Sequence, residues 1–361
     1  MSYNEDEYHI RESEQAGGYI FNNTGMYGCI YSGKLLCKNT KEIYLSPTDK
    51  YHKPLTKITL KEDAEIEYSI SNILRKIPIW RNYFAISEAI CEPSPLQIEP
   101  DINKCNVIKK VPIKELRIIS MKFNGKPIHS FNFNIKTLDL VQFVRRMLEA
   151  GALLAINGII HRDIHHGNVV VDNFVIPRII DFNLSIKTSI DNSKISNFLW
   201  HTYNYDLVQD SPDNMILLGV LHGHTIDSII HDIIHKNTMI LKLSVLFLIP
   251  MSTFEEEMVK FAYESKYIRE KNIVNWFRTF WRVIDSWAIG ALLAYKIFEF
   301  KHTYAYNRLY KYEELLFPIL KKMCEIDPRK RIDCVEALNM LNPNSVVIRA
   351  FGGKEWLLRK R

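Results

Sequence analysis

The residues with the clearest capacity for chemistry lie in two short segments, 161–168 and 180–183. Asp163 offers a carboxylate that can orient an attacking hydroxyl group and accept its proton. Asp181 offers a second carboxylate and Asn168 an amide oxygen, and such hard oxygen ligands suit Mg²⁺ or Mn²⁺ bound to phosphate. Because transfer of the γ-phosphate of ATP depends on positioning and charge neutralisation, these residues predict phosphoryl-transfer chemistry.

The two segments contain the motifs HRDIHHGN and DFN. They resemble the H-R-D-x-x-x-x-N and D-F-G motifs of the eukaryotic-type protein kinase superfamily. The resemblance implies an α+β, bilobal fold with a small β-rich N-lobe and a larger helical C-lobe. It also implies that Asp163 is the catalytic base and that Asn168 and Asp181 bind the metal. His165 stands where Ser/Thr kinases usually carry a lysine that touches the γ-phosphate, and it is expected to act in catalysis.

A glycine-containing segment near the N-terminus, residues 23–30, resembles the Gly-rich loop of the same family. Asn23 occupies the first glycine position, and Asn tolerates a positive φ better than most residues. Gly25 and Gly28 would let backbone N–H groups approach a phosphate closely. The resemblance therefore implies that Asn23, Gly25, Gly28 and Ile30 contact ATP.

Lys57 lies in an apolar run, residues 54–58, that is similar to the strand carrying the family's ATP-binding lysine. In that family the lysine binds the α- and β-phosphates and pairs with a glutamate on the next helix. We expect Lys57 to have this role, with Lys53 and Lys61 as alternatives.

The glutamate partner is expected on a helix over residues 65–77, where apolar side chains recur at helical spacing. Glu67 is the predicted partner and Glu65 the alternative. Further along, a strand over residues 116–121 leads into the segment that resembles the adenine-binding hinge. The resemblance implies that Met121 guards the inner pocket and that the segment through Phe123 holds the adenine ring.

The loop after Asp163 also resembles the D-x-H-x-G-N loop of aminoglycoside and choline kinases, which phosphorylate small molecules. Three later segments favour a protein kinase, namely 211–213 (SPD), 285–290 (DSWAIG) and 327–331 (DPRKR). By resemblance, Asp285 should be buried beneath the loop that carries Asp163. Arg331 should pair with Asp213.

The sequence departs from the family pattern at several places, which are Asn23, His165, Asn183 and a long helical insert at about residues 214–284. In these features it is similar to the divergent Ser/Thr kinases of large cytoplasmic DNA viruses. The expected activity is transfer of phosphate from ATP to Ser or Thr hydroxyls of a protein substrate. A small-molecule kinase and an inactive pseudokinase scaffold are the alternatives.

The order of the patterns predicts a strand-rich first part and a helix-rich second part. The expected divisions are an acidic tail over 1–15, the N-lobe over 16–123 and the C-lobe over 124–361. Within the C-lobe, the periodicity predicts a helix over 138–156 and short strands over 169–171 and 179–180.

The bulk composition adds limits on partners and location. The chain has 361 residues and a formal net charge of +6, and without a long basic block it predicts no dedicated nucleic-acid site. No apolar stretch is long enough to span a membrane. The six cysteines form no C-x-x-C pair and no secretory signal precedes them, so we expect free thiols, a cytoplasmic protein (in the host cytoplasm or virion if viral) and no structural zinc.

Overall fold

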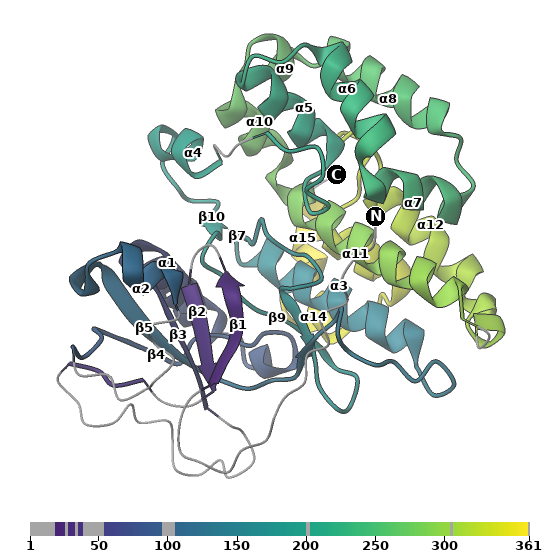
Figure 1. Ribbon diagram of the computed structural model, residues 1–361. Coiled ribbons are helices and arrows are strands. Elements are labelled where there is room, and N and C mark those ends of the chain that lie inside the picture. The colour runs from purple at the N-terminus through teal and green to yellow at the C-terminus, as the bar shows by residue number, and fades with distance from the viewer. Residues whose placement is uncertain are drawn as a thin grey trace. The chain divides into compact units, whose positions relative to one another are not determined.

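The computed structural model describes residues 19–25, 28–32, 35–38, 54–95, 105–199, 203–303 and 306–359. The predicted acidic tail over 1–15 and the alternative lysine Lys53 lie outside these residues. Within them the protein is a mixed α and β structure, with a small antiparallel sheet and a mostly helical remainder (Figure 1). The α+β class expected from the sequence is confirmed at this level.

The chain divides into two compact units. The first comprises the described residues up to Ala64 together with Ser87–Phe123, and the second comprises Glu65–Ile86 together with Asn124–Arg361. Each unit has its own cluster of buried apolar side chains.

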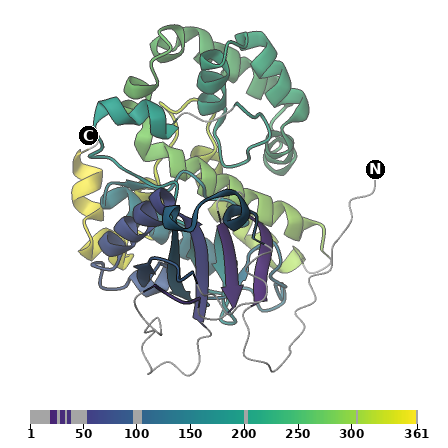
Figure 2. The ribbon, with the colours of Figure 1, turned by 60° about the vertical axis from the view of Figure 1, so that its left-hand side comes forward.

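The first unit is built on a five-stranded antiparallel sheet, whose strands lie side by side in Figures 1 and 2. Its order is β1-β2-β3-β5-β4. The strands are β1 (Tyr19–Gly25), β2 (Gly28–Ser32), β3 (Pro54–Leu60), β4 (Ala89–Cys91) and β5 (Leu116–Lys122). A short helix, α2 (Asn106–Lys110), and a 3₁₀ turn, η3 (Ile113–Glu115), lead into β5. The strand predicted over 116–121 is confirmed.

The strand register separates the predicted nucleotide-binding residues from the core of this unit. Lys57 on the central strand β3 pairs with Ile30 on one side and Ile119 on the other. Directly paired residues point to the same face, and this face recurs every second residue. Thr59 and Leu55 lie two positions to either side of Lys57 on β3. They pair with Gly28 and Met121, which therefore lie on that same face.

The opposite face of the sheet carries the core of the first unit. Its buried side chains include Cys29, Tyr31, Ile58, Leu116 and Ile118, and Val107 of α2 belongs to the same cluster. Alternation along β2, β3 and β5 thus leaves one face to pack the unit and the other to present Lys57.

Two disulfide bonds cross-link this core. They join Cys29 to Cys105 and Cys37 to Cys91. Only Cys324 and Cys334, both buried, are free thiols. The prediction of free thiols is wrong for these four cysteines, because the absence of a C-x-x-C pair says nothing about cysteines that folding brings together from distant positions.

Helix α1 (Lys61–Leu74) follows β3 directly. Two acids in its first turn, Glu62 and Asp63, favour its N-terminal end. Its buried side chains recur every three or four residues, at Ala64, Glu67, Ile70, Ser71 and Leu74, which is the pattern of a helix with one buried face. The predicted helix over 65–77 is confirmed, with an earlier start and an earlier end.

The second unit is largely helical (Figure 1). Its α-helices after α1 are α3 (Leu140–Ile156), α4 (Asn192–Leu199), α5 (Pro212–Leu221), α6 (Ile226–Lys236), α7 (Thr238–Phe247), α8 (Met251–Glu264), α9 (Lys266–Arg269), α10 (Ile273–Phe280), α11 (Ile284–Lys301), α12 (Glu313–Met323), α13 (Cys334–Leu341), α14 (Val346–Ala350) and α15 (Gly353–Arg359). Its 3₁₀ turns are η1 (Trp80–Asn82), η4 (Trp281–Val283), η5 (Tyr306–Arg308) and η6 (Tyr310–Tyr312). The segment predicted as a helical insert, 214–284, is indeed helical. No helix in the described ranges is long and apolar enough to cross a membrane.

Helix α3 is the centre of the second unit, and α11, α13, α14 and α15 pack against it. Its residues 147–155 are all buried. A Cβ on Gly151 would lie 2.5 Å from Cys334 Sγ and 2.6 Å from Ile289 Cδ1. Glycine at this position therefore lets α11 and α13 approach α3 closely.

Five short strands lie beside these helices. They are β6 (Lys126–Pro127), β7 (Ile159–Ile160), β8 (Val169–Val171), β9 (Pro177–Ile179) and β10 (Ile186–Lys187). They form one sheet of order β6-β8-β9 and a separate β10-β7 pair. Strands β8 and β9 correspond to the two short strands predicted beside the motif residues.

The Cys29–Cys105 bond yields a prediction for stability. The cysteines are 76 positions apart, and a bond that closes so long a loop typically contributes about 2–4 kcal/mol. Cys105→Ser should lower the urea midpoint of the oxidised protein. Cys324→Ser, which removes a free buried thiol, is the matched control. An unchanged midpoint for Cys105→Ser without reductant would contradict this role for the bond.

Candidate functional site

The loop over residues 161–168 lies between β7 and β8, and Asp181 follows β9. Because β8 and β9 pair antiparallel, the end of the loop and the start of the Asp181 segment are neighbours. Ile180 N donates a hydrogen bond of 3.0 Å to Asn168 O. Two of the predicted metal ligands, Asn168 and Asp181, therefore lie on adjacent strand ends of one unit.

Asp285, near the start of α11, holds the beginning of this loop. Its buried carboxylate accepts hydrogen bonds from His161 N (2.7 Å) and Arg162 N (2.9 Å). Burial raises the pKa of Asp285, and His161 and Arg162 oppose that rise. The expected burial of Asp285 beneath the loop is confirmed. Arg162 has a φ of +70°, a conformation that persists in non-glycine residues where surrounding contacts impose it.

The His161 side chain in turn holds the backbone of Asp163. Its buried ring accepts a hydrogen bond from Asp163 N at Nδ1 (3.2 Å) and contacts Ile180 O through Nε2 (2.9 Å). Because Nδ1 accepts a hydrogen bond, Nε2 is the ring nitrogen that donates to Ile180 O. The ring also lies edge-on to Phe182, with centroids 4.8 Å apart. One histidine thus positions the backbone on both sides of the candidate site.

The carboxylate of Asp163 is held at both oxygens. Asn168 Nδ2 donates to Asp163 Oδ2 (2.8 Å) and to Asp163 O (2.9 Å), and Gln209 Nε2 donates to Oδ1 (3.1 Å). His165 Nε2 lies 3.7 Å from Oδ2. Burial opposes ionisation of Asp163, but His165, His161 and Asn168 outweigh it and hold the pKa of Asp163 below its usual value. Asp163 is therefore an oriented, ionised carboxylate at neutral pH.

Gln209 is a site residue that the sequence did not reveal. It lies 46 positions after Asp163 and shortly before α5. A glutamine in an irregular segment carries no motif and no periodicity, so only the fold brings its amide to Asp163. The nearest available signal was the SPD segment that follows it.

His165 and Gly167 form one local feature. The His165 ring folds back so that its Nδ1 accepts a hydrogen bond from Gly167 N (3.0 Å). A Cβ on Gly167 would lie 2.7 Å from His165 Cε1. This position of the imidazole therefore requires glycine two residues later.

Asp181 has a φ of +62°. A non-glycine residue in this region costs about 1–3 kcal/mol, and such residues gather at functional sites. Asn183, which replaces the third residue of the D-F-G motif, is buried and is not among the residues with positive φ. The backbone here therefore has no need of glycine at position 183.

Arg331 and Asp213 form the ion pair that the family resemblance implied. Arg331 Nη2 lies 2.7 Å from Asp213 Oδ1, and both side chains are almost fully buried. The guanidinium also donates to Glu325 O (2.8 Å) and Ile326 O (3.1 Å). This predicted contact is confirmed, and it fixes the start of α5 just after the Gln209 segment.

Arg278 on α10 anchors the segment that follows the DFN motif. Its guanidinium donates to the carbonyls of Thr188 and Ile190 and to Asn192 Oδ1 (2.8 Å). These groups lie between the end of β10 and the first residue of α4. The predicted insert is thus bonded to the segment next to the site rather than only appended to the unit.

The remaining predicted residues belong to the first unit, except Glu67. Lys57 is buried on β3, and Gly28 and Ile30 lie on β2. A Cβ on Gly28 would lie 2.5 Å from Ile58 O, so the sheet itself requires glycine there. Asn23 and Gly25 lie on β1, Met121 lies on β5, and Phe123 follows β5 directly.

The two candidate partners of Lys57 differ in burial. Glu67 is 2% exposed, whereas Glu65 is exposed on α1. A buried carboxylate needs a compensating partner, so burial favours Glu67 over Glu65 for an ion pair. Both glutamates are assigned to the second unit and Lys57 to the first, and the Lys57–Glu67 pair stays a prediction.

No cluster of three or more His, Cys, Asp or Glu side chains in the described residues could hold a metal ion alone. His231 and His235 lie one helical turn apart on α6, with ring centroids 4.5 Å apart and ring planes tilted by 51°. The oxygen donors near Asp163 are of another kind, a carboxylate and an amide.

The chain matches no protein-family model and no curated protein sequence. The structure brings Asp163, His165 and Asn168 into contact in the second unit, and Asp181 follows Ile180, whose backbone amide is bonded to Asn168 O.

Breaking the Arg331–Asp213 pair should be strongly destabilising. Arg331→Ala leaves a buried carboxylate without its cation, which typically costs about 3–5 kcal/mol. Lys330→Ala is the matched control, since Lys330 is exposed and its ion pair with Glu257 (3.7 Å) should contribute less than about 1 kcal/mol. Urea unfolding measures both, and similar losses for the two variants would rule out a structural role for the buried pair.

Removing the Arg278 guanidinium should loosen the segment over 188–192. In Arg278→Ala, amide exchange there should become faster, with local stability lower by about 1–3 kcal/mol. Arg269→Ala is the control, because Arg269 also donates to carbonyls, those of Tyr263 and Glu264, elsewhere in the insert. Hydrogen exchange with mass spectrometry reads both. Unchanged protection in 188–192 would show that other contacts hold the segment.

Proposed function

We propose that this protein is an ATP-dependent protein kinase that transfers the γ-phosphate to Ser or Thr hydroxyls of a protein substrate. The observation that carries the proposal is the pair of buried contacts that frame Asp163. In one contact, the Asp285 carboxylate accepts a hydrogen bond from His161 N, 124 positions earlier in the sequence. In the other, Arg331 pairs with Asp213, 118 positions earlier. Both are expected from the resemblance to protein kinases, and neither is required by phosphate chemistry alone.

In this proposal Asp163 orients the substrate hydroxyl and accepts its proton. Its two oxygens are already fixed by Asn168 and Gln209, which is the positioning that phosphoryl transfer depends on. A pKa below the usual value keeps Asp163 ionised and able to accept a hydrogen bond. His165, beside Asp163, would donate a hydrogen bond to the transferred phosphate. Lys57 would bind the α- and β-phosphates, supported by Glu67, with Gly28, Ile30 and Met121 on the same sheet face contacting the nucleotide.

The residues near Asp163 fit a Mg²⁺ ion bound with ATP. Asn168 donates its amide nitrogen to Asp163 in two hydrogen bonds, so its Oδ1 is the atom left for a cation. Asp181 supplies a carboxylate on the neighbouring strand end. Mg²⁺ accepts a mixed set of protein, phosphate and water oxygens, which agrees with a site of few protein ligands. When bound, it would neutralise phosphate charge.

A protein substrate is favoured over a small molecule by the Arg331–Asp213 contact. In the family resemblance this pair closes the segment that receives a peptide, and here it fixes the start of α5 beyond Gln209. A D-x-H-x-G-N loop is shared by both classes and does not discriminate. Incubation with labelled ATP and either casein or a panel of amino-alcohols distinguishes a protein kinase from a small-molecule kinase.

Asp163→Asn should abolish phosphate transfer while ATP binding is retained. The amide cannot accept the proton, and loss of a general base typically costs roughly 10²–10⁴-fold in rate. Transfer to casein is followed with labelled ATP, and binding with a fluorescent ATP analogue. Asp191→Asn is the control, because Asp191 is exposed on the same unit.

Three results would count against the proposal in different ways. Normal turnover by Asp163→Asn would remove Asp163 as the base. Phosphorylation of an amino-alcohol but of no protein would indicate a small-molecule kinase. ATP binding without transfer to any acceptor, including the protein itself, would indicate a pseudokinase.

A further inference from the structure

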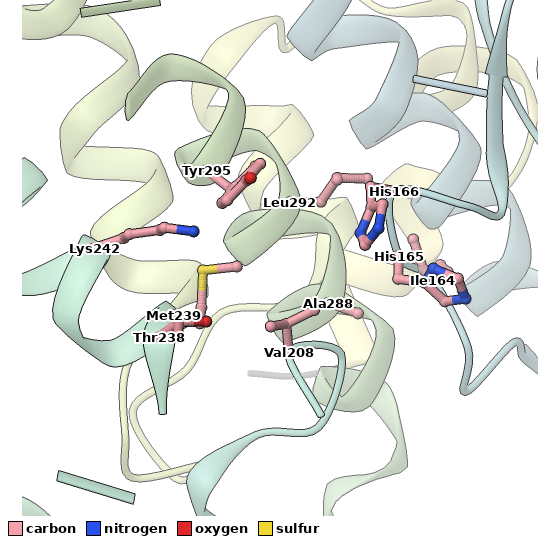
Figure 3. A pocket seen from close by; sticks show the side chains of 10 residues that line it. All are labelled: Ile164, His165, His166, Val208, Thr238, Met239, Lys242, Ala288, Leu292 and Tyr295. Atoms are coloured by element: carbon pink, nitrogen blue, oxygen red, sulfur yellow. The ribbon is translucent and has the colours of Figure 1, made fainter. Parts of the chain in front are cut away.

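A cavity of about 150 Å³ lies next to the candidate site within the second unit. Four segments line it, as Figure 3 shows, and Val208 comes from the segment just before α5. The loop contributes His165 and His166, α7 contributes Met239 and Lys242, and α11 contributes Leu292 and Tyr295. One water molecule needs only about 10–15 Å³ of such space, so the cavity has room for a side chain.

The walls are mostly apolar, and Lys242 is the cation among them. In Figure 3 its ammonium group points into the cavity, across from the loop histidines. Lys242 Nζ lies 4.1 Å from the centroid of the Tyr295 ring. Within the described part of the chain, no carboxylate forms a salt bridge with it. Burial lowers the pKa of Lys242, which means that its charge is incompletely solvated there.

The other charged groups around the cavity do not cancel this cation. Glu299 has the largest acidic effect on the pKa of Lys242, but its carboxylate is paired with Lys296. Asp206 is exposed, so solvent screens its effect. Burial lowers the pKa of His166 to about 4, and this ring is neutral at pH 7. An anion that entered the cavity would meet one positive charge.

The cavity wall is held in place before any ligand binds. Asn237 is buried, and its Oδ1 accepts from Met239 N (2.9 Å) and Ile240 N (3.0 Å) at the start of α7. Its Nδ2 donates to Tyr205 O (2.5 Å), in the segment that leads to Gln209. One side chain therefore couples the helix carrying Lys242 to the segment that contacts Asp163.

We propose that this cavity binds an anionic side chain of the substrate, close in sequence to the residue that is phosphorylated. Lys242 would hold the anionic group, and Met239 and Leu292 would hold the apolar stem. A glutamate carboxylate and a phosphoserine phosphate share this chemistry. The inference rests on the proposed kinase function and adds a substrate class to it.

The test uses peptides with one serine and a single variable neighbour position, moved along either side of the serine. Peptides with Glu, phosphoserine, Ala or Lys at that position are compared by kcat/KM. The wild type should prefer an anionic residue over Ala by about tenfold or more, the effect of one close charge pair. Lys242→Met should lose this preference, and Lys242→Glu should prefer Lys instead.

Lys260→Glu is the matched control, since Lys260 is exposed on α8 and does not line the cavity. Binding of a labelled glutamate peptide, read by fluorescence anisotropy without ATP, gives a readout that does not need phosphate transfer. Circular dichroism shows whether each Lys242 variant is folded.

The possible outcomes distinguish failure of the cavity assignment from failure of the proposed kinase activity. Wild-type turnover that is equal with Glu, phosphoserine and Ala, or an anion preference retained by Lys242→Glu, overturns the cavity assignment and leaves the kinase activity intact. Lys242-dependent binding with no transfer to any peptide supports the cavity and rejects the kinase. If the protein shows neither peptide binding nor phosphate transfer, both the cavity assignment and the kinase activity are rejected. A preference for phosphoserine over Glu supports the cavity and identifies phosphate as the anion.

Discussion

The geometry around Asp163 depends on one buried carboxylate, that of Asp285. An ionised or partly ionised carboxylate in an apolar interior is costly unless donors surround it, and here the donors are the backbone amides of His161 and Arg162. Those bonds help hold the left-handed turn at Arg162. His161 then holds the amide of Asp163. The position of the Asp163 carboxylate therefore depends on α11 through these backbone hydrogen bonds and the His161 ring.

The helices of the predicted insert take part in this arrangement. Helix α10 ties the segment after the DFN motif through Arg278, and α7 forms one wall of the cavity beside the loop. A deletion of the insert would therefore remove contacts to the site itself. This physical coupling argues that the insert and the site are one folding unit, in agreement with the continuous apolar cluster that contains α3, α7, α10 and α11.

Local patterns in the sequence predicted local structure well. Periodicity predicted α1, α3 and β5, and the resemblance to kinases identified the contacts of Asp285 and Arg331. Contacts with no local signature in the sequence could not be predicted. They are the hydrogen bond from Gln209 to Asp163, the hydrogen bonds from Arg278 to the segment after the DFN motif, and the pairing of the cysteines. Cys29 and Cys105 are separated by 76 positions, and only the register of β2 and the path into α2 bring them together. Helical periodicity favoured Glu67 over Glu65 as the buried glutamate, and the exposed fractions of the two side chains agree.

Two departures from the kinase motifs have local physical causes. Gly167 leaves room for the His165 ring, whose Nδ1 accepts the Gly167 amide, so histidine and glycine act as a coupled pair. Asn183 replaces a glycine where the backbone has no positive φ, while the left-handed residue is Asp181 itself. Each departure is therefore accommodated by its own surroundings, the first by side-chain packing and the second by backbone conformation.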